Sequence, residues 1–239
     1  MAETTEAPDA SIDHEAALSY WSSISSDVSG MLGGFPQISR VDLQGSANFL
    51  AKLRRQSSGS EPPRRGVDCG AGIGRVTEGF LSNACEVVDV VEPVAKFTQE
   101  IRCGDAFKQL REQGKVGELF NEGLETWRPE GDVYDLMWNQ WCLGHLTDSQ
   151  LVAYLEECGK ALRVGGWIIV KENMCTDPEG NDVFDKVDSS VTRTDKKFRR
   201  LFREAGLRLV RTELQTGFPR ALGLYPVRFY ALRPMTSKA

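Results

Sequence analysis

Apolar and polar positions repeat along this chain with two different spacings, which predict strands and helices in alternation. Short apolar runs predict six strands, at residues 64–68, 86–92, 134–138, 167–170, 207–210 and 227–232, and one more strand, the third along the chain, is expected before Gly123. Amphipathic spacing predicts helices at residues 149–162 and 195–205, and Gly206 ends the second one. Such alternation is typical of an α/β protein with a doubly wound, mostly parallel sheet and right-handed crossovers.

The segment before the first predicted strand divides into three parts. Residues 1–11 are acidic and lack an apolar core, so we expect a disordered lead-in and no secretory or mitochondrial presequence. Residues 12–55 carry apolar side chains at helical spacing and predict an N-terminal helical extension. Residues 56–64, rich in Ser and Pro, predict a linker into the sheet of residues 65–239. A length of 239 residues with 41% apolar content suits a single domain over 12–239.

A glycine-rich segment, residues 67–75, lies between the first predicted strand and a predicted helix start at 76–81. Its sequence is Val-Asp-Cys-Gly-Ala-Gly-Ile-Gly-Arg, and glycines at this spacing permit tight turns and a ligand close to the main chain. In parallel sheets this position binds ligands at a helix N-terminus. The last glycine comes one residue too early for the dinucleotide pattern. With Asp68 two residues before the first glycine, the segment resembles the S-adenosylmethionine loop of class I methyltransferases.

A second acid supports this interpretation. Glu92 ends the second predicted strand, 18 residues after Gly74. A carboxylate at the C-terminal tip of that strand can accept both hydroxyls of an adenosine ribose and disfavours a 2′-phosphate. The two signals together predict S-adenosyl-L-methionine as the cofactor.

Charge and cysteine usage narrow the possible partners and locations. The net charge is −5 and the pI about 5.3, and no basic block dominates, so we expect a cationic partner such as a basic peptide and no nucleic acid. No apolar run approaches ~18 residues, so we expect no membrane partner. Six cysteines without a C-x-x-C pair and only two histidines predict no metal site. Reduced thiols suit a cytoplasmic protein, with the nucleus as a further location.

The segments that follow the fourth and fifth predicted strands are more specific. After the fourth strand, the proline signature of enzymes that methylate exocyclic base amines is absent, and residues 139–148 carry a Trp–His segment instead. Several segments together resemble the eukaryotic α-N-terminal protein methyltransferases, which modify proteins exposing an X-Pro-Lys N-terminus. The matching segments are 20–21, 31–34, 68–75, 140–141, 144–148, 173–174, Asp185, 187–190 and 231–233. Two departures are Glu92 in place of the usual Asp and a longer acidic loop at 176–180.

This resemblance implies a seven-stranded Rossmann-like methyltransferase sheet, with the helices of residues 12–55 as a lid over cofactor and substrate. It implies, together with the motifs above, cofactor contacts from Trp21, Met31, Gly70, Gly72, Arg75, Glu92, Gly123, Leu124 and Gln140. It implies substrate contacts from Leu32, Gly33, Ile38, Trp141, Asp185, Ser190 and Tyr225. Tyr20 is expected in the lid, and Asp177 is expected to attract a substrate lysine together with Asp185 and Asp188.

Methylation of an α-amine needs an unprotonated nucleophile, yet a free α-amine with a pKa of ~7.7–8.0 is mostly protonated at neutral pH. A base, or a carboxylate that takes the proton through water, must therefore lie near the amine. Asp188 and His145 are the candidates, and Asn173 is expected to bind the amine or a substrate carbonyl. The alternatives are structural: an N-cap for Asp188, a helix-start residue bonded to backbone for His145, and a strand-end cap for Asn173.

The leading hypothesis is thus an enzyme that methylates the α-amine of X-Pro-Lys proteins, with ribosomal proteins among the candidates. A small-molecule N-methyltransferase is the alternative enzyme, and it needs no acidic channel long enough for three residues. A cofactor-binding module without catalysis is the third hypothesis, which the presence of Asn173, His145 and Asp188 disfavours.

Overall fold

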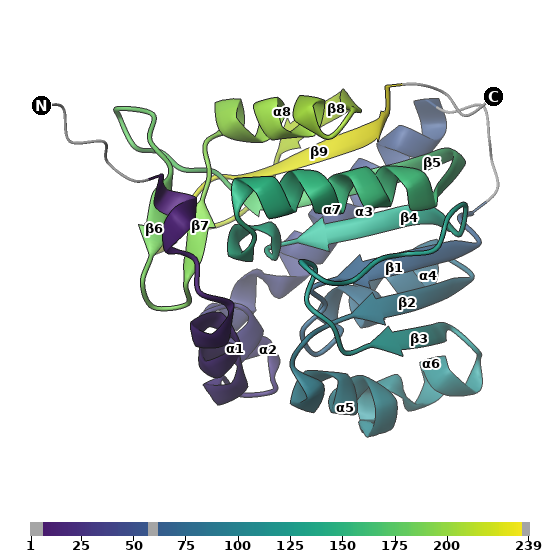
Figure 1. Ribbon diagram of the computed structural model, residues 1–239. Helices are drawn as coiled ribbons and strands as arrows, with labels where there is room; N and C mark the ends of the chain where they lie inside the picture. Colours follow the sequence, from purple (N-terminus) through teal and green to yellow (C-terminus); the bar gives the residue numbers. More distant parts are fainter. Residues whose placement is uncertain (1–6, 57–61, 236–239) are drawn as a thin grey trace, which may run out of the picture.

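The computed structural model describes residues 7–56 and 62–235, and Figure 1 shows a sheet with helices on both faces. Seven strands form this sheet in the order β3-β2-β1-β4-β5-β9-β8. Their bounds are β1 Arg65–Cys69, β2 Val87–Val91, β3 Val116–Phe120, β4 Tyr134–Gln140, β5 Leu162–Asn173, β8 Leu207–Leu214 and β9 Val227–Pro234. Strands β1 to β5 are parallel, whereas β9 is antiparallel to both β5 and β8. The predicted doubly wound, mostly parallel seven-stranded sheet is confirmed.

Helices precede and flank this sheet. The α-helices are α1 His14–Ser23, α2 Val28–Met31, α3 Ser39–Gln56, α4 Ser82–Ala84, α5 Ala95–Cys103, α6 Lys108–Glu112, α7 Asp148–Ala161 and α8 Asp195–Glu204. Short 3-10 helices lie at Pro8–Ser11, Pro36–Ile38, Asp105–Phe107, Leu143–His145 and Arg220–Leu222. Within 7–56 and 62–235, no helix is long and apolar enough to cross a membrane.

Alternation of side chains along β4 places α3 and α7 on opposite faces of the sheet. Leu136 and Trp138 are fully buried in a cluster with the apolar side chains of α3. Met137 points to the other face and is buried in a cluster with residues of α7 and α8. Since successive side chains of a strand point to opposite faces, the middle of this central strand, Leu136 to Trp138, is apolar on both faces.

Two local structures differ from the sequence-based expectation. A small hairpin of β6 Val183–Asp185 and β7 Ser190–Thr192 was not predicted, because three-residue strands are too short to show an alternating pattern. After the glycine loop, the expected helix start at 76–81 is a π-helical turn at Thr77–Leu81, which continues into α4.

The predicted disordered lead-in is wrong for its last residues. Residues 8–11 form a 3-10 helix, and the Asp9 carboxylate accepts the backbone N–H of Asp148 at 2.8 Å. This N–H is one of the donors that a helix N-terminus leaves without an intrahelical partner, so a nearby carboxylate is stabilising. Residues 1–6 lie outside the described part of the chain. Of the predicted linker 56–64, Gln56 is the last residue of α3, and 57–61 also lie outside the described part.

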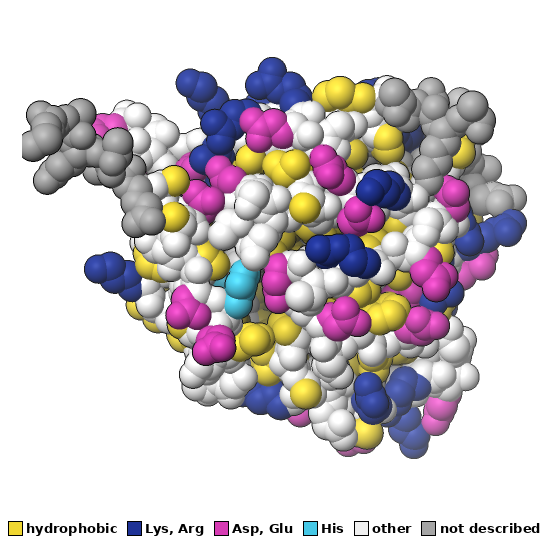
Figure 2. Space-filling model, viewed as in Figure 1, with side chains coloured by type: hydrophobic (Ala, Val, Ile, Leu, Met, Phe, Trp, Pro, Cys, Tyr) yellow, Lys and Arg dark blue, Asp and Glu magenta, His cyan; other side chains and the backbone are white. Residues whose placement is uncertain are grey.

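The densest basic segment of the sequence lies on the surface of α8. Figure 2 shows Lys and Arg side chains over this helix, near the upper edge of the view. Lys197 and Arg200 pair with Asp148, and Arg199 pairs with Asp195. These pairs balance much of the positive charge, which agrees with a solvated helix face.

Candidate active site

A cavity of about 670 Å³ lies at the C-terminal ends of the parallel strands, where sheets of this kind bind ligands. Except for Asp177, every residue predicted to bind cofactor or substrate, or to act in catalysis, lines it. From the N-terminal helices and the sheet these are Trp21, Met31, Leu32, Gly33, Ile38, Gly70, Gly72, Arg75, Glu92, Gly123 and Leu124. From the later segments they are Gln140, Trp141, His145, Asn173, Asp185, Asp188, Ser190 and Tyr225. One continuous cavity therefore joins the two groups, and which ligand each residue contacts remains a prediction.

Two further residues expected at the site have other positions. Tyr20 does not belong to the cavity lining; its ring packs edge-on against that of Trp21, with the centroids 5.3 Å apart. Asp177 is also outside the lining, and its carboxylate accepts the backbone N–H of Asn181 at 2.9 Å. Asp185, in contrast, lines the cavity from the end of β6 and is exposed there. The structure thus separates Asp177 from the acidic residues at the cavity.

The glycine loop has the backbone conformation and the space that a close ligand needs. Gly70 and Gly72 have φ angles of 66° and 57°, in the left-handed region that favours glycine. A Cβ atom at Gly72 would lie 2.4 Å from Met31 Sδ, so Met31 of α2 packs directly against this glycine. A side chain at either position would fill the space between the loop and its neighbours. The loop therefore presents its main-chain atoms to the cavity without side chains in the way.

Glu92 combines with this loop to fit an adenosine ribose. One of its carboxylate oxygens accepts the N–H of Gly72 at 2.7 Å, and the other accepts the N–H of Val94 at 2.8 Å. A carboxylate oxygen has two acceptor sites, so each keeps capacity for a hydroxyl donor. Burial raises the pKa of Glu92 to about 7, although these two hydrogen bonds oppose the rise. The buried acceptor pair beside the glycine loop is the observation that fits S-adenosyl-L-methionine to this cavity.

A cluster of buried polar and charged residues, two of which line the cavity, was not predicted from the sequence. Asp42 of α3 is fully buried and pairs with Arg75 at 2.8 Å and with the ammonium of Lys171, also fully buried. The amide of Gln140 donates to both Asp42 oxygens, at 3.1 and 2.9 Å. These four residues are the Asp42 cluster. Arg75 and Gln140 line the cavity as predicted, but their polar groups are held by Asp42.

Opposing effects set the charge states in the Asp42 cluster. Burial alone would raise the pKa of Asp42, but the charges of Lys171 and Arg75 hold it below its usual range. Burial lowers the pKa of Lys171 to about 8, against the attraction of Asp42. Two cations therefore surround one carboxylate, and one of them, Arg75, lines the cavity. The sequence carried no signal for Asp42, because a single acid at a helical position usually faces solvent.

The turn after β4, residues 141–146, carries Trp141 and His145 to the cavity. Trp141 has a φ of 55°, a strained value for a residue other than glycine. Its indole N–H is buried and has no hydrogen-bond partner among the described residues. The carboxylate of Glu172, at the end of β5, accepts the N–H groups of Cys142 and Leu143, both at 2.9 Å. Burial raises the pKa of Glu172 to about 7. We refer to residues 141–146 as the 141–146 turn.

His145 is hydrogen-bonded to the lid. The indole N–H of Trp21 donates to its Nε2 at 3.1 Å, so Nε2 is the acceptor and Nδ1 carries the proton of the neutral ring. Nδ1 is buried. Burial lowers the pKa of His145, and His14 adds to this, whereas Asp188, a hydrogen bond with the backbone of Ser189, and Glu125 raise it. His145 is the last residue of the 3-10 helix Leu143–His145 and lies before α7, which begins at Asp148 with Thr147 as its N-cap.

Asp188 lies in the turn between β6 and β7 and faces the same cavity. Its Oδ1 accepts the hydroxyl hydrogen of Ser190 at 2.7 Å. The next residue, Ser189, has a φ of 54°, and its hydroxyl oxygen accepts the N–H of Asp13 at the start of α1. The N-cap alternative is wrong, since Thr194 caps α8.

Asn173 is the last residue of β5 and is paired there with Val227 of β9. The three candidate catalytic residues thus come from three separate segments.

Comparisons with known proteins agree with this site. Residues 9–233 match the family described as AdoMet dependent proline di-methyltransferase. Alpha N-terminal protein methyltransferase 1 of Schizosaccharomyces pombe is 44% identical over 223 residues, which cover 92% of this chain and 96% of the relative. N-terminal Xaa-Pro-Lys N-methyltransferase 1 of Xenopus tropicalis is 39% identical over 219 residues, which cover 91% of this chain and 93% of the relative.

Solved structures agree as well. A SAM-dependent methyltransferase from Leishmania major is 35% identical and superposes with a TM-score of 0.81, covering 97% of this chain and 88% of its own. The resemblance to the eukaryotic α-N-terminal protein methyltransferases is therefore confirmed over most of the chain. The chain belongs to the AdoMet dependent proline di-methyltransferase family.

Proposed function

We propose that this protein transfers methyl groups from S-adenosyl-L-methionine to the α-amino group of proteins that begin with X-Pro-Lys. The observation that carries the proposal is the single cavity that runs from the glycine loop and Glu92 to Trp141, Asn173 and Asp188. Its two parts suit a cofactor and a peptide end that must meet. Relatives at 44% and 39% identity that are named for this activity support the same conclusion.

The cofactor is expected on the side of the cavity formed by β1 and β2. Glu92 would accept the ribose hydroxyls, and Arg75, whose cluster has one cation in excess, would face an anionic group of the ligand. When bound, S-adenosyl-L-methionine supplies a sulfonium methyl group for in-line attack by an amine. Met31 would close this side, because it already packs against Gly72.

The substrate N-terminus is expected between the 141–146 turn, the end of β5 and the β6–β7 hairpin. Asn173 would bind the amine or a substrate carbonyl, and the ring of Trp141 would pack on the proline. We assign the amine proton to the carboxylate of Asp188. His145 Nε2 already accepts the indole N–H of Trp21, so it cannot take a proton at that atom without losing this bond.

Mass spectrometry tests the proposal directly. Purified protein is incubated with S-adenosyl-L-methionine and a peptide that begins Ser-Pro-Lys, and we expect methyl groups on the α-amine. The matched control is the same peptide with an acetylated N-terminus, which should gain none. Methylation of the acetylated peptide would place the methyl groups on the lysine side chain and contradict the proposal, whereas methylation of small amines in place of the peptide would favour the small-molecule alternative.

Selectivity for the lysine tests the acidic side of the cavity. If Asp185 binds the lysine, replacing that lysine by glutamine should raise KM about fivefold, since an exposed charge pair contributes at most ~1 kcal/mol. Asp185→Asn should remove most of this difference. Asp177→Asn is the matched control, because Asp177 is an acid of the same region outside the cavity lining. Equal kinetics of the wild-type protein on both peptides would contradict the role of Asp185.

Ribosomal proteins that begin with X-Pro-Lys are the substrates to test first in this proposal, because their basic N-termini suit an acidic cavity rim. The cytoplasm, with the nucleus as a further location, stays a prediction that imaging of the tagged protein would check.

A further inference from the structure

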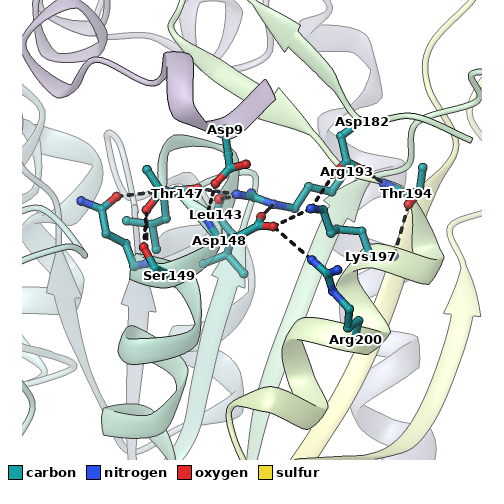
Figure 3. Close-up of polar contacts among 12 residues, drawn as sticks. Asp9, Leu143, Thr147, Asp148, Ser149, Asp182, Arg193, Thr194, Lys197 and Arg200 are labelled. Carbon is teal, nitrogen blue, oxygen red and sulfur yellow. Dashed lines mark hydrogen bonds and ion pairs between the residues drawn. The ribbon is translucent and has the colours of Figure 1, made fainter. Parts of the chain in front are cut away.

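Arg193 is a fully buried charged residue directly after β7. Its side chain binds the segment that runs from the end of β4 to the start of α7. Its Nε donates to Asp148 at 3.0 Å, and its Nη1 donates to the carbonyl oxygen of Leu143 at 2.9 Å. Its Nη2 donates to the carbonyl oxygen of Leu146. Figure 3 shows this side chain reaching toward Leu143 and Asp148, with Asp148 also contacted by Lys197 and Arg200.

The two carbonyl groups bound by Arg193 stand on either side of His145 in the 141–146 turn. The carboxylate of Glu172 binds the N–H groups at the start of the same turn. The guanidinium of Arg193 therefore binds carbonyl oxygens of the turn, while the buried carboxyl group of Glu172 binds its N–H groups. Buried backbone groups outside helices and strands need such partners, and charged partners make the stronger hydrogen bonds.

Arg193 also reaches the other two segments that carry candidate catalytic residues. Its carbonyl oxygen accepts the N–H of Cys175 at 3.0 Å, two residues after Asn173. It directly follows β7, the strand that begins at Ser190 next to the turn containing Asp188. Arg193 is thus in contact with, or covalently continuous with, the segments of Asn173, His145 and Asp188.

We propose that Arg193 is a positioning residue, which holds the 141–146 turn in register with Asn173 and the β6–β7 hairpin so that His145 and Asp188 face one amine. This inference rests on the proposed function. Lysine cannot replace the arginine, because one ammonium group cannot bind two carbonyl oxygens and a carboxylate in the planar geometry of a guanidinium.

The test compares Arg193→Lys with the wild-type protein on the Ser-Pro-Lys peptide. We expect kcat to fall by about a hundredfold, which is the loss that a displacement of ~1 Å in a reacting group can cause. The affinity for S-adenosyl-L-methionine, measured by calorimetry, should stay unchanged, because Arg193 makes no contact with the glycine loop or Glu92. The pH profile of kcat should also shift, since His145 and Asp188 no longer keep their relative position.

Chemical rescue separates positioning from general stability. In Arg193→Gly, added guanidinium at millimolar concentration should restore part of kcat, whereas urea at the same concentration should not. Arg200→Gln is the matched control: Arg200 contacts the same Asp148 at 3.4 Å but is half exposed, and this variant should keep the wild-type kcat. If Arg193→Lys does not fold, Asp148→Asn loosens the same guanidinium from a partly exposed position and should lower kcat in the same way.

Each outcome decides between explanations. A folded Arg193→Lys with wild-type kcat and pH profile would overturn the proposal, as would an unchanged kcat in Asp148→Asn or an equal loss in Arg200→Gln. Failure of the wild-type protein to methylate the peptide would instead refute the proposed function, and it would do so independently of every variant.

Discussion

The Asp42 cluster offers a demanding test of what holds the N-terminal helices to the sheet. In Asp42→Asn the shape of the side chain is kept, but its charge is removed, and Arg75 and Lys171 are left without their shared counter-charge. The carboxylate and the ammonium are remote from bulk water, since the side chains of Asp42 and Lys171 have no exposed surface. The variant therefore isolates the electrostatic contribution of α3 to stability.

The magnitude follows from the contacts. At an effective dielectric constant of ~20, a unit charge ~4 Å away contributes about 4 kcal/mol, so two cations could stabilise the carboxylate by about 8 kcal/mol. Desolvation of the ions offsets several kcal/mol of this, and removal of one partner from a buried ion pair typically costs ~3–5 kcal/mol. We expect Asp42→Asn to lower the free energy of unfolding by about 3–5 kcal/mol. Loss of the proton from Lys171, whose pKa burial already lowers to about 8, limits the cost.

Urea unfolding at about pH 7.5 measures this difference, with an unchanged m-value as the condition for comparing the two proteins. The difference should narrow as pH falls. The folded pKa of Asp42 is below its usual range, so the stability from its charge is present above the unfolded pKa and is lost as pH falls through the folded one. Lys171→Met added to Asp42→Asn should recover part of the loss. A loss of less than ~1 kcal/mol, the value of an exposed pair, would refute the reasoning.

Two further predictions concern the cavity itself. Burial raises the pKa of Glu92 to about 7, so this carboxylate gains a proton as pH falls through that value. The affinity for S-adenosyl-L-methionine, measured by calorimetry, should therefore weaken from about pH 8 to pH 6. Glu92→Gln should show no such trend. Trp21→Phe removes the indole N–H that occupies His145 Nε2, so the pKa of His145 should rise, as an NMR titration of its ring would show. Tyr20→Phe, which keeps the ring that packs on Trp21, is the control, and an identical titration for Trp21→Phe would remove the assigned contact.

Local patterns were sufficient for most of the sheet and its helices. The strand expected at 86–92 is Val87–Val91, and the helix expected at 195–205 is Asp195–Glu204. Each depends on side-chain periods of two or about 3.6 residues and on nearby terminating residues, which are properties of neighbouring positions. Gly206 after the second helix has a φ of 69°, as expected of a residue that ends a helix in the left-handed conformation.

Much of the site could be placed by the same local reasoning. Residues that follow parallel strands come together at one edge of the sheet, so the sequence alone was enough to expect Glu92, Gln140 and Asn173 at one cavity. The resemblance to a family added the residues of the lid and the hairpin. It could not show that Asp177 lies outside the cavity lining, because the path of a loop depends on contacts with the rest of the molecule.

Only the folded molecule shows the pairs that hold this site together. Asp42 and Lys171 are 129 positions apart, and Arg193 meets Leu143 across 50 positions. Neither pair leaves a mark in the sequence around its members: an isolated acid on a helix and an arginine after a short strand each have the pattern of a solvated residue. Their partners are decided when the apolar faces of α3, α7 and the sheet pack, since packing alone determines which charges are buried side by side.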